Sequence, residues 1–133
     1  MEALNVLIIE DDALIGMLLT EMLQEMGHVV CATAVTEEEA VADAIRCKPS
    51  LIIVDEQLLE GSGMSAVERI LQTGSVPCVF MSGAHVRRPG ATVLQKPFVE
   101  ADLVRAIRNV VDRADLPAAA IPVAALPQRS LHG

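Results

Sequence analysis

The sequence predicts an α/β protein in which helices cover both faces of a doubly wound, five-stranded parallel sheet. Two observations carry this prediction. Short apolar runs alternate along the chain with segments of helical periodicity. Two of these runs, Val6–Ile9 and Leu51–Val54, are apolar at every position, which is typical of strands buried on both faces. Helices that connect such strands by right-handed crossovers pack on both sides of the sheet.

The chain begins with a strand and a helix. Val6–Ile9 forms the first predicted strand and is followed directly by acidic residues. Apolar residues then recur at helical spacing from Leu14 to Met26, which predicts an amphipathic helix. Gly27 supplies a typical C-terminal stop for this helix.

A second strand and helix follow at once. Residues 29–34 are predicted to form the second strand. Thr36 and Glu39 make a capping-box pattern, in which a hydroxyl and a carboxylate three residues apart satisfy the first N–H groups of a helix. We expect this helix to end before Pro49, because proline cannot continue it.

The remainder of the chain continues the alternation. The strands expected here are 51–54, 76–81 and 92–95, and the helices are 64–74 and about 100–113. Residues 1–113 are therefore predicted to form one domain. Residues 114–133 are rich in alanine and carry a proline at every fifth position, which predicts a flexible or polyproline-like tail.

Composition excludes several functions. The chain has 10 Lys and Arg against 18 Asp and Glu, and the resulting net charge of −8 disfavours nucleic acid as a partner. No apolar run has the length of a membrane span, and the N-terminus lacks the basic region of a signal peptide. The three cysteines show no metal-binding spacing. These features predict a soluble, cytoplasmic protein.

Chemically active residues follow the predicted strands. Asp11 and Asp12 come after the first strand and Asp55 after the third, while Ser82 ends the fourth and Lys96 the fifth. The carboxyl ends of parallel strands meet at one edge of the sheet, so these side chains are expected to lie together.

Carboxylates crowded at one edge need a counter-ion. A hard divalent cation with oxygen ligands supplies it, and Mg²⁺ suits a small site of this kind. An aspartate beside the metal can act as a nucleophile toward a phosphoryl group. The metal and a lysine ammonium would offset charge on the transferring oxygens.

This ordered set resembles the receiver domain of two-component response regulators, over about residues 6–113. The resemblance implies a flavodoxin-like fold with strand order 2-1-3-4-5 and a stand-alone, single-domain type. Asp11 and Asp12 then correspond to the acid pair that binds Mg²⁺, with Asp12 as the more direct ligand. Asp55 corresponds to the phosphoacceptor, and the backbone carbonyl of Gln57 completes the metal site.

Further positions match the same family. Ser82 resembles its switch hydroxyl, and Gly63 its loop glycine. Lys96 and Pro97 resemble its Lys-Pro pair, whose peptide bond is usually cis. The resemblance implies that the chain takes a phosphoryl group from a sensor histidine kinase and slowly catalyses its own dephosphorylation, without being a metabolic enzyme. Output would pass through an unidentified downstream protein, or the chain would act as a phosphate sink.

Three departures from the family pattern stand out, and the last two keep an alternative open. Leu59 stands where a proline is common, and Val93 stands where an aromatic switch residue is usual. The segment between Ser82 and Lys96 is short, so its helix is expected to be shortened or replaced by a loop, and the apolar surface this would release is compatible with a homodimer. The alternative is a pseudo-receiver, a protein-binding adaptor that works without phosphorylation.

Overall fold

Strands and helices alternate along the chain in the computed structural model, which describes residues 2–83 and 90–115. The strands are β1 (Asn5–Ile9), β2 (Val29–Ala34), β3 (Leu51–Asp55), β4 (Cys78–Ser82) and β5 (Thr92–Gln95). The helices are α1 (Ala13–Glu25), α2 (Glu37–Cys47), α3 (Gly63–Leu71) and α4 (Glu100–Asp115).

The five strands form one sheet in the order β2-β1-β3-β4-β5, and each neighbouring pair is parallel. This confirms the predicted fold class and strand order. The order reverses between β1 and β3, so the connections leave these two central strands toward opposite sides. Their carboxyl ends therefore flank the point where a doubly wound sheet binds its ligands.

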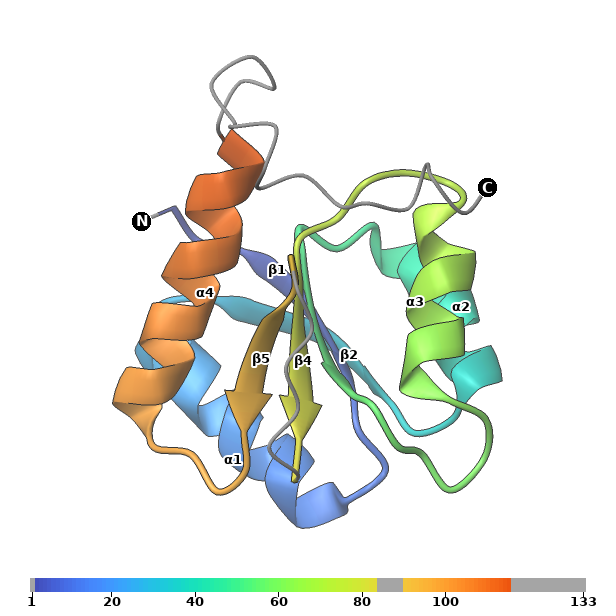
Figure 1. Cartoon of the computed structure of the whole chain (residues 1–133), viewed down its shortest axis with the longest axis horizontal. Helices are drawn as coiled ribbons and strands as arrows, with labels where there is room; N and C mark the ends of the chain where they lie inside the picture. The colour runs from blue at the N-terminus through green and yellow to red at the C-terminus, as the bar shows by residue number, and fades with distance from the viewer. Residues whose placement is uncertain (1, 84–89, 116–133) are drawn as a thin grey trace.

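Helices cover both faces of the sheet, with α1 and α4 on one face and α2 and α3 on the other (Figure 1). Successive side chains of β1 serve opposite faces, as the period of a strand requires. Val6 and Ile8 pack with α1 and α4, whereas Leu7 and Ile9 pack with α2 and α3. All four side chains are fully buried, which explains why this strand is apolar throughout.

Some element ends differ from the prediction. Helix α3 ends at Leu71 instead of near Gly74, because Thr73 closes a tighter turn by donating its N–H to the carbonyl of Ile70. Helix α4 continues two residues beyond the expected end, to Asp115.

Two expectations concern parts of the chain outside the described residues. The expected loss of a helix between Ser82 and Lys96 depends on residues 84–89, and most of the expected tail is residues 116–133. Within the described ranges, no helix combines the length and hydropathy that crossing a bilayer would require.

Candidate active site

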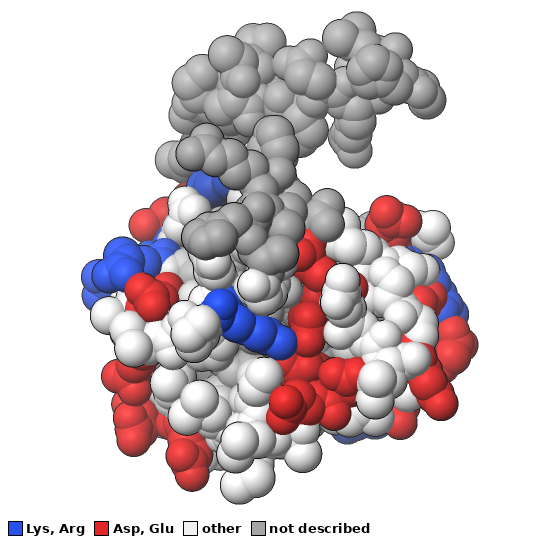
Figure 2. All heavy atoms as spheres, turned by 60° about the horizontal axis from the view of Figure 1, so that its bottom comes forward, with Lys and Arg blue, Asp and Glu red and all other residues white. Residues whose placement is uncertain are grey.

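The carboxyl edge of the sheet is acidic. Asp55 is the last residue of β3, and Glu10 directly follows β1. Both lie in the interior, with exposed fractions of 9% and 1%. Figure 2 turns this end of the molecule toward the viewer and shows acidic side chains gathered near its centre, with a basic side chain lying against them.

Three carboxylates at this edge could share one cation. Glu10, Asp11 and Asp55 each offer a carboxylate oxygen, and these atoms lie within 4.8 Å of one another. An all-oxygen, negatively charged donor set of this size fits Mg²⁺, which usually binds one or two carboxylates and retains several waters. The residues present therefore fit the expected metal.

The structure gives Asp12 a different place from the one expected from sequence. Its carboxylate Oδ1 accepts hydrogen bonds from the N–H groups of Leu14 at 2.9 Å and Ile15 at 3.3 Å, which makes it the N-cap of α1. The carboxylates that lie together at this edge are accordingly those of Glu10, Asp11 and Asp55, and Asp12 is not among them. An aspartate directly before a helix is itself a capping signal, and that signal could have separated the two roles.

Lys96 is the cation that meets this acidic group. Its Nζ lies 2.8 Å from Oδ2 of Asp55 and 2.9 Å from Oε1 of Glu10. The backbone N–H of Lys96 donates to the carbonyl of Ser82 at 2.8 Å, which ties the end of β5 to the end of β4. The Lys96–Pro97 peptide bond is cis, which confirms the isomer that the family resemblance implied.

The two buried carboxyl groups hold their protons differently. Burial, helped by a hydrogen bond to Asp55, raises the pKa of Glu10 to about 7. Burial also acts to raise the pKa of Asp55, but hydrogen bonds from Glu10, Lys96 and the Gln57 N–H outweigh it, and the pKa of Asp55 is lowered. Asp55 is thus the ionised carboxylate of the pair, with Lys96 as its counter-ion.

The loop between β3 and α3 folds back over the site. The N–H of Gln57 donates to Oδ1 of Asp55 at 3.1 Å, and the N–H of Leu59 donates to Oδ2 of Asp11 at 2.6 Å. Gly63 begins α3 so close to β3 that a Cβ there would lie 1.9 Å from the carbonyl oxygen of Asp55. A residue without a side chain is required at this contact.

Ser82 completes the edge. It is the last residue of β4, is 7% exposed, and lies opposite Gln95 in the sheet register. The structure therefore brings Asp11, Asp55, Lys96 and Ser82 to one edge, as expected from their positions after the strands. Glu10, which the sequence did not assign to the metal, joins them.

Comparison with known proteins identifies the family of this chain. A family model described as the response regulator receiver domain matches residues 6–108. The chain belongs to the response regulator receiver domain family. It is a receiver of two-component signalling, and the recognised resemblance is confirmed.

The receiver is similar to several named regulators. It is 40% identical over 117 residues to the phyllosphere-induced regulator PhyR of Methylorubrum extorquens, covering 82% of this chain and 44% of that protein. It is 37% identical over 117 residues to the transcriptional regulatory protein PdtaR of Mycobacterium tuberculosis, covering 82% of this chain and 57% of that protein. The chain thus spans about half the length of these relatives.

A solved structure of a similar domain matches nearly end to end. The solution structure of the PhyR receiver domain from Erythrobacter litoralis has a TM-score of 0.78 and 33% identity. The match covers 89% of this chain and 97% of that one.

Proposed function

We propose that this receiver takes a phosphoryl group from the phosphohistidine of a sensor histidine kinase onto Asp55, and that the transfer requires Mg²⁺. The observation that carries the proposal is the state of Asp55. It is buried, its pKa is lowered, and Lys96 Nζ lies 2.8 Å away while Glu10 and Asp11 stand beside it. An ionised carboxylate held between a cation and a metal-binding acid pair suits a nucleophile for phosphoryl transfer.

The chain's own residues support each part of the transfer. A carboxylate oxygen of Asp55 forms the new bond to phosphorus while the bond from phosphorus to the imidazole nitrogen of the kinase histidine breaks. The Lys96 ammonium offsets negative charge on the phosphoryl oxygens, and the Ser82 hydroxyl donates to one of them. Attack of water on the same phosphorus later releases phosphate and restores Asp55.

Glu10, Asp11 and Asp55 would hold the metal, with the backbone carbonyl of Gln57 as a fourth protein ligand. Asp12 is left out of this set because it caps α1. When bound, Mg²⁺ supplies positive charge to the phosphoryl oxygens in the transition state. Glu10 must lose its proton to become a ligand, so metal binding and proton release are coupled.

We expect the kinase to dock on exposed apolar side chains near the carboxyl edge of the sheet. Leu14, Met17 and Leu18 are exposed on α1, Leu59 on the loop above Asp11, and Val99 just before α4. These segments all begin or end at the carboxyl edge, where the acidic group lies. A partner that covered them would exclude water from the transfer.

Output passes through a partner protein, or the receiver drains phosphoryl groups from a shared kinase. The phosphoryl group adds negative charge at Asp55, close to the ends of β4 and β5. We expect Lys96 and Ser82 to move toward it, which would alter the face formed by β4, β5 and α4.

Intact-mass measurement after incubation with acetyl phosphate tests the proposal. Wild type should gain one phosphoryl group in the presence of Mg²⁺ and none after chelation, and Asp55→Asn should gain none in either condition. Measurable Mg²⁺ binding without an adduct would contradict the proposal and favour the phosphorylation-independent adaptor.

A further inference from the structure

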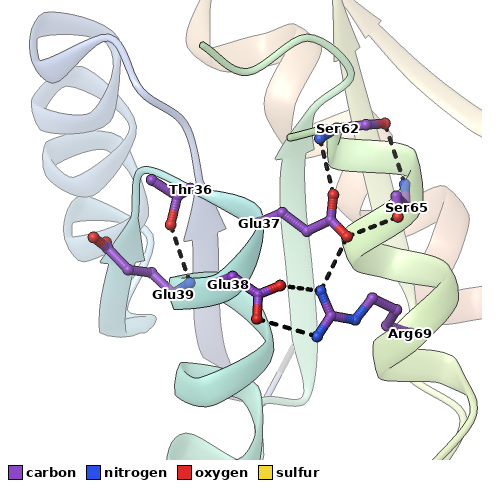
Figure 3. Close-up of polar contacts among 7 residues, drawn as sticks. All are labelled: Thr36, Glu37, Glu38, Glu39, Ser62, Ser65 and Arg69. Carbon is purple, nitrogen blue, oxygen red and sulfur yellow. Dashed lines mark hydrogen bonds and ion pairs between the residues drawn. The ribbon is translucent and has the colours of Figure 1, made fainter. Parts of the chain in front are cut away.

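One carboxylate outside the acidic group, that of Glu37, holds the β3–α3 loop, which folds back over that group. Glu37, the first residue of α2, reaches across to the β3–α3 loop and to α3 (Figure 3). Its Oε1 accepts a hydrogen bond from the backbone N–H of Ser62 at 3.1 Å. Its Oε2 accepts from Oγ of Ser65 at 2.7 Å and from Nη1 of Arg69 at 3.0 Å. These donors act to lower the pKa of Glu37, so it stays charged.

The backbone of Glu37 contacts the same loop. Its N–H donates to the carbonyl of Glu60 at 3.3 Å, just before the loop turns at Gly61. Gly61 has a φ of +87°, and a Cβ there would lie 2.6 Å from Cβ of Glu37. The loop is thus held against Glu37 on both sides of this glycine, in a conformation that a larger residue could not adopt.

The start of α2 does not need the Glu37 carboxylate. Thr36 Oγ1 accepts from the N–H of Glu39 at 3.1 Å, and Oε1 of Glu39 accepts from the N–H of Val35 at 3.2 Å. Thr36 thus caps the helix, and Glu39 holds the residue before the cap, without the Glu37 carboxylate. The Glu37 side chain is therefore free to serve the neighbouring loop.

The loop connects Glu37 to the phosphoacceptor. Ser62 forms an antiparallel bridge with Gln57, and the N–H of Gln57 donates to Oδ1 of Asp55 at 3.1 Å. Between these two residues, the N–H of Leu59 donates to Asp11. Anchoring Ser62 therefore fixes the base of a short loop whose backbone contacts two acids of the site.

We propose that Glu37 is a positioning residue for the metal and phosphoacceptor site: it fixes the β3–α3 loop so that the Gln57 backbone faces the cation that Asp11 and Asp55 would hold. This inference rests on the proposed function and deepens it. Glu37 touches no reacting atom and acts only through the loop. Removing its carboxylate should leave the acids in place and loosen the backbone that completes their site.

Glu38 provides a matched control. It also pairs with Arg69, but it makes no contact with the loop among the bonds described, and its side chain is 79% exposed against 18% for Glu37. Glu38→Ala therefore removes a carboxylate from the same helix turn, one that pairs with the same arginine. The hydrogen bond from Ser62 to Glu37 is left in place.

Titration of Mg²⁺ into the full chain, followed by calorimetry and by the amide NMR signals of Gln57 and Leu59, tests the inference. Glu37→Ala should weaken Mg²⁺ binding by about tenfold, the scale expected for loss of an outer-shell partner. Glu37→Gln should restore most of the affinity, because its amide oxygen can still accept from the Ser62 N–H. Glu38→Ala should bind Mg²⁺ as wild type does.

A fall in melting temperature for Glu37→Ala with unchanged Mg²⁺ affinity would overturn the inference, since the residue would then serve stability alone. An equal loss of affinity in Glu38→Ala would overturn it as well. If wild type itself binds no Mg²⁺, the proposed function fails. The amide signals of the metal-free variants still report the loop in that case, and signals unchanged by Glu37→Ala would overturn the positioning role separately.

Discussion

Proton occupancy sets the behaviour of the site at the scale of single residues. Glu10 and Asp55 share one lysine, yet burial raises the pKa of Glu10 to about 7 while Asp55 stays ionised. Without a metal, Glu10 can hold a proton and donate it to Asp55, which spares the interior a second negative charge. A bound cation would take over that role.

Mg²⁺ affinity should consequently depend on pH. Below a pH of about 7 the cation must displace the Glu10 proton, so the apparent affinity should fall by up to about tenfold per pH unit. Calorimetric titrations between about pH 5.5 and about pH 8 check this. Glu10→Gln should flatten the dependence, and a wild-type affinity that is constant across this range would contradict the coupling.

The same raised pKa predicts the sign of a stability effect in metal-free protein. The protonated Glu10 contributes stability that is fully present below the ordinary carboxyl pKa of 4.5 and is lost as pH rises through about 7. Chelator-treated wild type should therefore lose more unfolding free energy across this range than Glu10→Gln does.

At the scale of secondary-structure elements, the start of α1 separates the acid that caps the helix from the acids that lie beside Asp55. Helix α1 begins at Ala13, one residue after Asp12, and its first N–H groups need an acceptor. Asp12 supplies it, and the carboxylates that lie together beside it are those of Glu10, Asp11 and Asp55.

Substitutions at Asp12 can separate capping from metal binding. Asp12→Ala should lower the free energy of unfolding by about 1 kcal/mol, and Asp12→Asn should cost little, because asparagine caps helices nearly as well. Both variants should keep Mg²⁺ affinity within about twofold of wild type, whereas Asp11→Asn should lose at least about tenfold. A large loss of affinity in Asp12→Asn would restore Asp12 as a ligand.

The start of α3 makes a second prediction at this scale. Gly63→Ala places a Cβ against the backbone carbonyl of Asp55, so α3 must shift, and overpacking of this kind costs about 1–3 kcal/mol of unfolding free energy. Gly74→Ala is the control, because a Cβ there meets nothing within 4 Å. Denaturant unfolding of both variants decides the matter; equal stabilities would show that the close approach is not a constraint.

At the scale of the whole molecule, the site lies where the sheet can transmit a change. Lys96 N–H binds the Ser82 carbonyl, and Asn109 Nδ2 donates to Oγ1 of Thr92 at 2.9 Å, which links α4 to β5. A displacement of Lys96 or Ser82 toward a phosphoryl group would therefore reach the outer face of the molecule through β5.

Phosphorylation should change amide NMR signals well beyond the site. We expect shifts at Thr92 and Asn109 as well as at Gln57 when acetyl phosphate is added to protein already saturated with Mg²⁺, and none when it is added to Asp55→Asn under the same conditions. Changes confined to the immediate neighbours of Asp55 would contradict transmission through β5 and favour a phosphate sink.

The fold could be predicted well from the sequence because the patterns that specify its strands and helices are local and recur along the chain. Apolar runs such as Val6–Ile9 and the capping box at Thr36 indicate their elements without help from distant residues. The residues that could hold a metal are harder to choose from the sequence, since three consecutive acids follow β1 and only the start of α1 separates Asp12 from Glu10. The role of Glu37 depends on a tertiary contact with Ser62, which no spacing along the chain indicates.

The central claim is that Asp55 accepts the phosphoryl group, and locating the adduct tests it most directly. The receiver would be incubated with acetyl phosphate and Mg²⁺ and reduced with borohydride, which converts an aspartyl phosphate to homoserine. Peptide mass spectrometry should then find homoserine at position 55 in wild type, and only when Mg²⁺ was present. Homoserine at another aspartate, or a phosphoryl adduct that persists in Asp55→Asn, would contradict the account.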